Sequence, residues 1–122
     1  MNIRVAIVDD DESVCRSFAR LLSIVDIQSV SYGSAEAFMA EAGRADFDCL
    51  VLDIQLSGMS GLELQAQLVA EGFPVPILFI TAYDDTTSRR QAESLGCAAF
   101  FRKTDPGMSI IEAIRAVAPR AL

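Results

Sequence analysis

The sequence predicts an α/β fold, built as one domain around a single parallel β-sheet. Short apolar runs alternate with stretches of helical periodicity along the whole chain, and this alternation is typical of repeated βα units. The chain has 122 residues, of which 52% are hydrophobic, so it can fill one core but has no room for a second domain. We therefore expect one domain over residues 1–122, with five strands and five helices.

Five short apolar runs are the predicted strands of this sheet. In chain order they are Arg4–Val8, Ile27–Tyr32, Cys49–Asp53, Ile77–Thr81 and Ala98–Arg102. Because a helical segment separates each run from the next, the strands are expected to be parallel, with their carboxyl ends at one edge of the sheet.

Three predicted helices are indicated by an apolar face or a capping residue. The first helix carries four apolar residues at helical spacing, namely Val14, Phe18, Leu21 and Leu22. Ser34 is the expected N-cap of the second helix, which buries Phe38. Asp105 and Pro106 are the expected N-cap and first residue of the last helix. Its expected inward-facing residues are Ile110, Ile111, Ile114 and Val117.

The other two helices differ in how firmly the sequence specifies them. Ser60 and Glu63 match the S-x-x-E capping box, so the third helix should begin there and run to about Glu71. The fourth helix, Thr86–Leu95, is poor in large apolar residues and ends at Gly96. We expect it to be the most weakly attached helix of the domain.

Charge and cysteine content exclude several classes of function. The net charge is −7, and no run of five or more basic residues occurs, so direct nucleic-acid binding by this domain is not expected. The apolar runs are too short to cross a membrane and no secretory leader is recognisable, which favours the cytoplasm. Cys15, Cys49 and Cys97 lack C-x-x-C spacing and histidine partners, so we expect buried or half-buried thiols rather than disulfides or zinc ligands.

Carboxylates follow two of the predicted strands. Asp9, Asp10, Asp11 and Glu12 come directly after the first strand, and Asp53 ends the third. If these strands are neighbours in a parallel sheet, at least three carboxylates meet at the edge where open α/β sheets bind ligands. Hard oxygen ligands without histidine favour Mg²⁺ over zinc or copper. The sequence therefore predicts a magnesium-binding acidic pocket.

Four separated motifs together resemble the receiver domain of bacterial two-component response regulators. Asp9 and Asp10 match the family's acidic pair after the first strand, and Asp53 matches its phospho-accepting aspartate. Thr81 and Lys103 match the hydroxyl residue after the fourth strand and the lysine after the fifth. The similarity covers essentially the whole chain and implies a flavodoxin-like, doubly wound (βα)5 fold with strand order 2-1-3-4-5.

The resemblance implies a signalling phospho-acceptor domain rather than an enzyme. Asp53 would accept a phosphoryl group, in a Mg²⁺-dependent reaction, from a sensor histidine kinase or a histidine phosphotransfer protein. Because the chain contains no histidine, that donor must be a partner. The face made by helix 4, strand 5 and helix 5 would then change to control an output, expected to be transcription, and is a candidate homodimer surface.

The expected site is assembled from the matched residues and their neighbours. Asp10 and Asp53 are expected to bind Mg²⁺ directly, with the main-chain carbonyl of Gln55 as a third ligand. Asp9 is expected to act through water. Lys103 should pair with Asp53 at rest and with the phosphoryl group afterwards.

Two further pairs of residues are expected to control the conformational switch and the lifetime of the phosphorylated state. The Thr81 hydroxyl should be drawn to the phosphoryl oxygen, which lets Phe100 rotate inward. Gln55 and Tyr83 lie two residues after Asp53 and Thr81, so both should flank the path of the hydrolytic water. The exposed charges of the fourth helix are expected to pair across a partner; they are Arg89, Arg90 and Glu93.

The chain departs from the usual family pattern at three positions. Thr104 follows Lys103 where proline is common, so we expect a trans peptide bond there and a shifted last loop. Ser57 stands where proline is common, which should leave the loop after the acceptor looser. Phe100 lacks the hydroxyl of a tyrosine at the switch position, so its inward state should be less costly. Gly58 and Gly61 are expected to be turn glycines with unusual dihedral angles.

Some of these residues have a purely structural interpretation, and two other functions are alternatives to the phospho-acceptor. Asp11 and Glu12 are expected to be only a helix cap and a solvated charge. A degenerate receiver would be a phosphorylation-independent protein-interaction module, which the complete set of acids, threonine and lysine disfavours. A nucleotide- or flavin-binding domain would need a glycine-rich first βα turn, whereas this turn is acidic.

Overall fold

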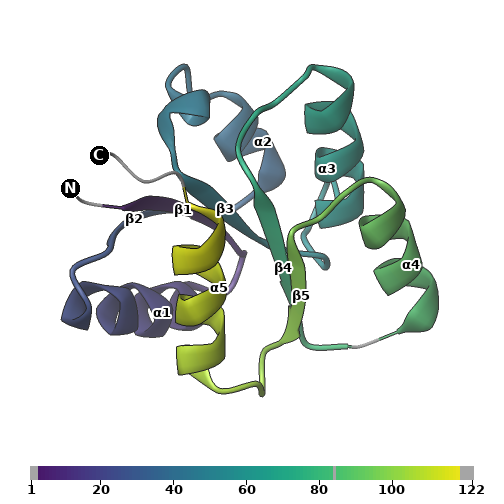
Figure 1. Cartoon of the computed structure of the whole chain (residues 1–122). Coiled ribbons are helices and arrows are strands. Elements are labelled where there is room, and N and C mark those ends of the chain that lie inside the picture. The colour runs from purple at the N-terminus through teal and green to yellow at the C-terminus, as the bar shows by residue number, and fades with distance from the viewer. Residues whose placement is uncertain (1–2, 84, 119–122) are drawn as a thin grey trace.

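The domain is a five-stranded parallel sheet with helices on both faces (Figure 1). The computed structural model describes residues 3–83 and 85–118. Its elements are β1 (Arg4–Val8), α1 (Glu12–Ile24), β2 (Gln28–Tyr32), α2 (Ala35–Met39), the 3-10 turn η1 (Arg44–Asp46), β3 (Cys49–Asp53), α3 (Gly61–Ala70), β4 (Ile77–Thr81), α4 (Thr86–Ser94), β5 (Ala99–Arg102) and α5 (Gly107–Val117). The strand order is β2-β1-β3-β4-β5, which confirms the predicted fold and order.

The predicted strands agree with the structure to within one residue at each end. The second and fifth begin one residue later than expected, at Gln28 and Ala99. The short turn η1 was not predicted, because three residues without an apolar repeat leave no periodic signal. None of the helices in the described part of the chain combines the length and the apolar character needed to cross a bilayer.

Two apolar layers cover the two faces of the sheet. Alternate residues of β3 point to opposite sides, so that Leu50 and Leu52 belong to one core cluster and Cys49 and Val51 to the other. The first cluster includes side chains of α2, α3 and α4, and the second includes side chains of α1 and α5. Figure 1 shows α1 and α5 on one side of the sheet and the other three helices opposite.

The three thiols are packing groups, as expected. Cys15 and Cys49 are buried and Cys97 is half-buried, and none of them is in a disulfide. Burial raises the pKa of Cys49 to about 12, so this thiol stays neutral at physiological pH.

Most expected helix faces and caps are present. In α1 the buried residues are Cys15, Phe18 and Leu22, whereas Val14 is only partly buried, so the predicted apolar face is rotated toward Cys15. The Asp11 carboxylate caps α1 by accepting hydrogen bonds from the backbone N–H groups of Ser13 and Val14, as expected. Both hydrogen bonds of the α3 capping box, Ser60 with Glu63, are also present.

The start of α5 differs from the prediction. Pro106, rather than Asp105, is the N-cap, and it makes no side-chain capping hydrogen bond. The Asp105 carboxylate instead accepts a hydrogen bond of 2.9 Å from the backbone N–H of Arg102. Because this aspartate closes the turn that precedes it, it is not available to cap the helix that follows.

Candidate functional site

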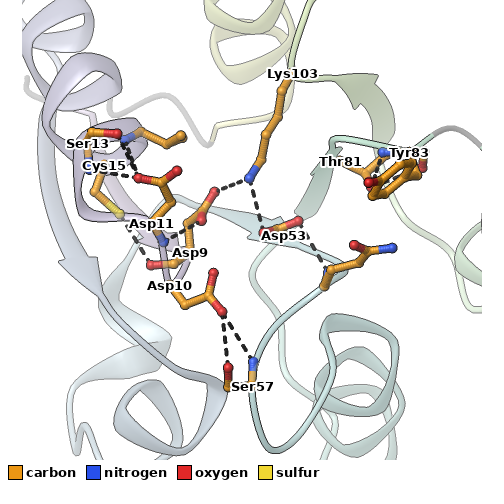
Figure 2. A network of polar contacts seen from close by, with 12 residues as sticks. Asp9, Asp10, Asp11, Ser13, Cys15, Asp53, Ser57, Thr81, Tyr83 and Lys103 are labelled. Atoms are coloured by element: carbon orange, nitrogen blue, oxygen red, sulfur yellow. Dashed lines mark hydrogen bonds and ion pairs between the residues drawn. The ribbon is translucent and has the colours of Figure 1, made fainter.

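Three carboxylates converge at the carboxyl edge of the sheet. Strands β1 and β3 are parallel neighbours, with Val8 paired to Leu52, so Asp9 and Asp53 leave the sheet side by side. One carboxylate oxygen from each of Asp9, Asp10 and Asp53 lies within 4.8 Å of one from each of the others. The convergence predicted from the two strand ends is therefore confirmed (Figure 2).

Asp53 is buried at the end of the central strand β3, with 3% of its surface exposed. Its Oδ1 accepts a hydrogen bond of 3.3 Å from the backbone N–H of Gln55. Burial, reinforced by the negative charge of Asp9, raises the pKa of Asp53, while Lys103 opposes that rise. The carboxylate is thus held in an environment that favours a second cation beside it.

Lys103 bridges two carboxylates rather than one. Its Nζ lies 3.2 Å from Asp53 Oδ2, as expected, and 2.9 Å from Asp9 Oδ2 (Figure 2). Burial lowers the pKa of the Lys103 ammonium, but the hydrogen bond and charge of Asp9, together with those of Asp53, outweigh burial and raise it. The backbone N–H of Lys103 donates to the Thr81 carbonyl at 2.8 Å, which fixes where the side chain begins. The contact with Asp9 was not predicted, because it depends on the register of β1 against β3.

Asp9 and Asp10 have different surroundings although they are adjacent in sequence. Asp9 is 2% exposed, and its Oδ1 accepts a hydrogen bond of 2.9 Å from the backbone N–H of Asp11. Asp10 is exposed, and its Oδ2 lies 3.3 Å from the backbone N and 3.4 Å from the Oγ of Ser57. Asp10 is therefore the carboxylate of the cluster that is open to solvent, whereas Asp9 is engaged with Lys103.

The loop after Asp53 is held from two sides. Asp10 contacts Ser57, and Glu36 of α2 accepts a hydrogen bond of 2.9 Å from the backbone N–H of Met59. Loss of proline at position 57 was expected to loosen this loop, but the serine provides two hydrogen-bond donors that a proline lacks.

The two glycines of this loop serve different purposes. Gly58 has a φ of +78°, which agrees with its expected role in a turn. Gly61 has no positive φ; a Cβ there would collide with the backbone carbonyl of Asp53, so its role is close approach rather than an unusual dihedral angle. The first turn of α3 thereby packs directly against the backbone of Asp53.

Thr81 lies at the same edge but is engaged with the chain that follows it. It is 1% exposed, its hydroxyl donates to the Tyr83 carbonyl at 3.0 Å, and it accepts from the Tyr83 backbone N–H at 3.2 Å. The Tyr83 side chain is 65% exposed and lies beside Thr81 (Figure 2). Any hydrogen bond from Thr81 to a group on Asp53 therefore requires a change in the first residues after β4.

Phe100 packs between the sheet and α4. It is half-buried, its ring centroid lies 6.0 Å from that of Phe79, and the Arg89 guanidinium carbon lies 5.2 Å from its centroid. The Arg89 Nε also lies 3.5 Å from Glu93 Oε2 on the same helix. In the unmodified chain Arg89 and Glu93 thus pair with each other, and the expected pairing of Arg89, Arg90 and Glu93 across a partner stays a prediction.

The last loop begins with a trans peptide bond between Lys103 and Thr104, as expected, since the chain contains no cis peptide bond among its described residues. Thr104 is exposed and Lys103 is half-buried. The loop thus delivers the lysine side chain to the carboxylates without a proline at position 104.

The donor set suits a hard divalent cation. Three carboxylates gather at one point, the chain has no histidine, and none of the three cysteines belongs to the cluster. One of the carboxylates, Asp10, is exposed and so can be reached from solvent. These residues fit Mg²⁺ better than they fit zinc or copper.

Comparison with known proteins agrees with this geometry. The family model for the response regulator receiver domain matches residues 5–115. The chain is 32% identical to the response regulator protein TmoT of Ectopseudomonas mendocina, over 91% of this chain and 50% of that protein. It is 34% identical to the transcriptional regulatory protein FixJ of Azorhizobium caulinodans, over 94% of this chain and 54% of that protein.

A solved structure shows the same likeness in three dimensions. The crystal structure of FixJ-N superposes with a TM-score of 0.86 at 32% identity, covering 100% of this chain and 99% of that one. The chain spans about half the length of the curated relatives that it matches. The matched family model, the identities and the arrangement of the five strands lead to one conclusion: the chain belongs to the receiver domain family of response regulators.

Proposed function

We propose that Asp53 accepts a phosphoryl group, in a Mg²⁺-dependent reaction, from a partner histidine kinase or histidine phosphotransfer protein. The observation that carries this proposal is the position of the Asp53 carboxylate. It is buried at the end of the central strand, its Oδ2 is 3.2 Å from the one lysine of the chain, and two further carboxylates adjoin it.

The chemistry follows from how these groups are arranged. An Asp53 carboxylate oxygen forms a bond to phosphorus while the bond from phosphorus to the donor atom breaks, and the donor leaves with the electron pair of that bond. The Lys103 ammonium, already hydrogen-bonded to Asp53, is positioned to donate to the incoming phosphoryl oxygens. Two observations support Asp53 rather than Asp9 as the acceptor: Asp53 ends the strand at the position that resembles the family's phospho-accepting aspartate, and Asp9 is already held at 2.9 Å by the same lysine.

The acidic pocket has a separate task in this proposal. Asp10 and Asp53 would hold Mg²⁺ directly, with the Gln55 carbonyl as a third ligand and Asp9 acting through water. When bound, the ion neutralises charge that would otherwise repel a phosphoryl group from the carboxylates. Asp10 fits the part of direct ligand, since its carboxylate is exposed, and Asp9 fits the indirect part, since Lys103 and the Asp11 N–H already occupy its two oxygens.

Phosphorylation would act on the rest of the domain through Thr81 and Phe100. To reach a phosphoryl oxygen, the Thr81 hydroxyl must release the carbonyl of Tyr83, which frees the segment that leads into α4. Space vacated near Thr81 would let Phe100 turn inward, away from the Arg89 guanidinium. The surface of α4, β5 and α5 would change shape and become the contact for a partner, including a second copy of the chain.

The output is proposed to be transcription. The relatives compared above are a response regulator and a transcriptional regulatory protein, and this chain corresponds to about half of each. Direct binding to nucleic acid is assigned to no residue of this domain, whose net charge is −7. A cytoplasmic location is part of the same proposal.

The test is a mass measurement. Incubation with acetyl phosphate and Mg²⁺ should add one phosphoryl group, located at Asp53 by trapping and fragmentation. Asp53→Asn and omission of Mg²⁺ should each abolish the gain, whereas Asp46→Asn, at an exposed position of η1, should leave it intact. A protein that binds its partners equally well without any mass gain would instead be a phosphorylation-independent interaction module.

A further inference from the structure

Helix α4 is attached to the domain by few contacts, one of which is the exposed Arg89 side chain over the ring of Phe100. Within α4, all of which is described, Ala92 is the only buried residue, and the remaining side chains are polar or charged. The Asp85 carboxylate caps the first turn locally, accepting from the Ser88 backbone N–H at 3.0 Å, so the cap does not join the helix to another element. The buried attachment of α4 to the domain therefore lies near Ala92.

Gln65 of α3 supplies such a contact. The side chain is 1% exposed, and its Nε2 donates a hydrogen bond of 2.9 Å to the carbonyl oxygen of Ala92. Its Oε1 is buried and has no hydrogen-bond partner among the described residues. A buried amide with one unpaired oxygen is costlier than an apolar side chain of the same size, so overall stability does not explain a glutamine here.

The carbonyl that Gln65 holds also closes the carboxyl end of α4. The backbone N–H of Cys97 donates to the same Ala92 oxygen at 3.1 Å, and Gly96, with a φ of +87°, ends the helix. A pocket of about 260 Å³, lined in part by Gln65, Leu95 and Gly96, lies next to this contact. The hydrogen bond from Gln65 therefore links α3 to the end of α4 that leads into β5.

We propose that Gln65 is a positioning residue that makes Ala92 the pivot of α4. The carboxyl end of the helix is held to α3 by a buried hydrogen bond, while its amino end contributes no buried side chain and can swing. The effect of this pivot on switching rests on the proposed function, whereas the Gln65–Ala92 hydrogen bond, here called the tether, does not. With an apolar residue at position 65, α4 would shift as a whole instead of rotating about Ala92.

The tether is tested on the unmodified protein with Gln65→Met, which keeps the length of the side chain and removes its donor. Amide hydrogen exchange of α4 should become about fivefold to tenfold faster, the change expected for one lost hydrogen bond. The urea midpoint of global unfolding should stay the same or rise, because the unpaired Oε1 is removed as well. Gln67→Met, at an exposed position of the same helix, is the matched control.

A positioning role predicts faster amide exchange in α4 without a lower urea midpoint, whereas a merely structural role predicts that both stabilities fall together. Gln65→Leu, a smaller apolar replacement, should reproduce the faster exchange. Unchanged exchange of α4 in both variants, or a fall in the urea midpoint that accounts for the faster exchange, would overturn the proposal.

A second arm adds beryllofluoride and Mg²⁺ as a phosphoryl mimic. In the wild-type protein, amide shifts should be largest at residues 86–89 and smallest around Ala92, whereas in Gln65→Met they should extend through residues 92–95. The same shift pattern in both proteins would overturn the pivot. If the wild-type α4 does not respond to the mimic, the proposed switch fails, while exchange in the unmodified protein still decides whether Gln65 is the tether.

Discussion

The acidic edge of the sheet and helix α4 are built in opposite ways. At the edge, Asp9 and Asp53 leave adjacent buried strands, and Lys103 joins them at 2.9 and 3.2 Å. Helix α4 has one buried residue and one buried hydrogen bond to α3. The difference teaches where each part of a switch belongs: chemistry needs groups fixed to fractions of an ångström, whereas a change of shape needs an element that is weakly attached.

The largest effect is expected from removing the lysine. Lys103→Met leaves two buried carboxylates without their cation, so the free energy of unfolding should fall by about 3 kcal/mol at neutral pH. The loss should shrink in acid, as the carboxylates take up protons. Urea unfolding measures it, with exposed Arg90→Met as a control that should change stability by less than about 0.5 kcal/mol. Equal stability of wild type and Lys103→Met would show that the edge is not held by this ion pair.

Asp10→Asn should weaken Mg²⁺ binding about tenfold, equivalent to about 1.4 kcal/mol, because it removes the one exposed carboxylate of the cluster. The chain has a single lysine, so isotope-labelled lysine gives one side-chain NMR signal from the centre of the site. That signal should move during a Mg²⁺ titration in the sub-millimolar to millimolar range. Glu12→Gln, at an exposed position two residues after Asp10, should behave as wild type. No movement of the lysine signal up to the highest Mg²⁺ concentration of the titration would refute the metal site.

Asp53→Asn should stabilise the unphosphorylated domain by about 1 kcal/mol at neutral pH, a typical size for one substitution. The pKa of Asp53 is raised by burial and by Asp9, so the stability associated with its protonated form is present below its ordinary pKa and is lost as pH rises through the raised pKa. The advantage of the variant should therefore appear with rising pH and vanish in acid. A stability gap that does not depend on pH would contradict this cause.

A smaller effect is expected at the rim of the site. The ring of Tyr83 lies beside Thr81 and offers no base, so it should hinder the approach of the hydrolytic water. Tyr83→Ala should shorten the lifetime of the phosphorylated protein severalfold, whereas Tyr83→Phe, which keeps the ring, should not. Gln55 is also exposed and next to the acceptor, and Gln55→Ala should act in the same direction. The decay of the phosphorylated protein is measured by intact mass. An unchanged or longer lifetime in Tyr83→Ala would contradict the shielding by the ring.

Much of the fold could be predicted because the sheet leaves a strong signal in sequence. Buried parallel strands appear as apolar runs, so their ends were located to within one residue, and the two acidic strand ends predicted the cluster of Asp9, Asp10 and Asp53. The weak attachment of α4 was equally visible in its polar composition.

What could not be predicted depends on contacts between distant segments. An aspartate before a helix can cap it or close the preceding turn, and Asp105 does the latter. Ser57 was expected to loosen its loop, but its donors face Asp10, which lies 47 residues away in the chain. Gln65 belongs to a helix with an ordinary capping box, and nothing in its local sequence indicates that its amide reaches Ala92.

The central claim is that the fixed edge drives the weakly attached helix. It is tested most directly by residue-resolved amide shifts with and without beryllofluoride and Mg²⁺, with Thr81→Ala as the uncoupled variant. We predict shifts at the ends of β1 and β3 in both proteins, and shifts in α4, β5 and α5 in the wild type only. Shifts confined to the acidic edge of the wild-type protein, with no response from α4, would contradict the claim.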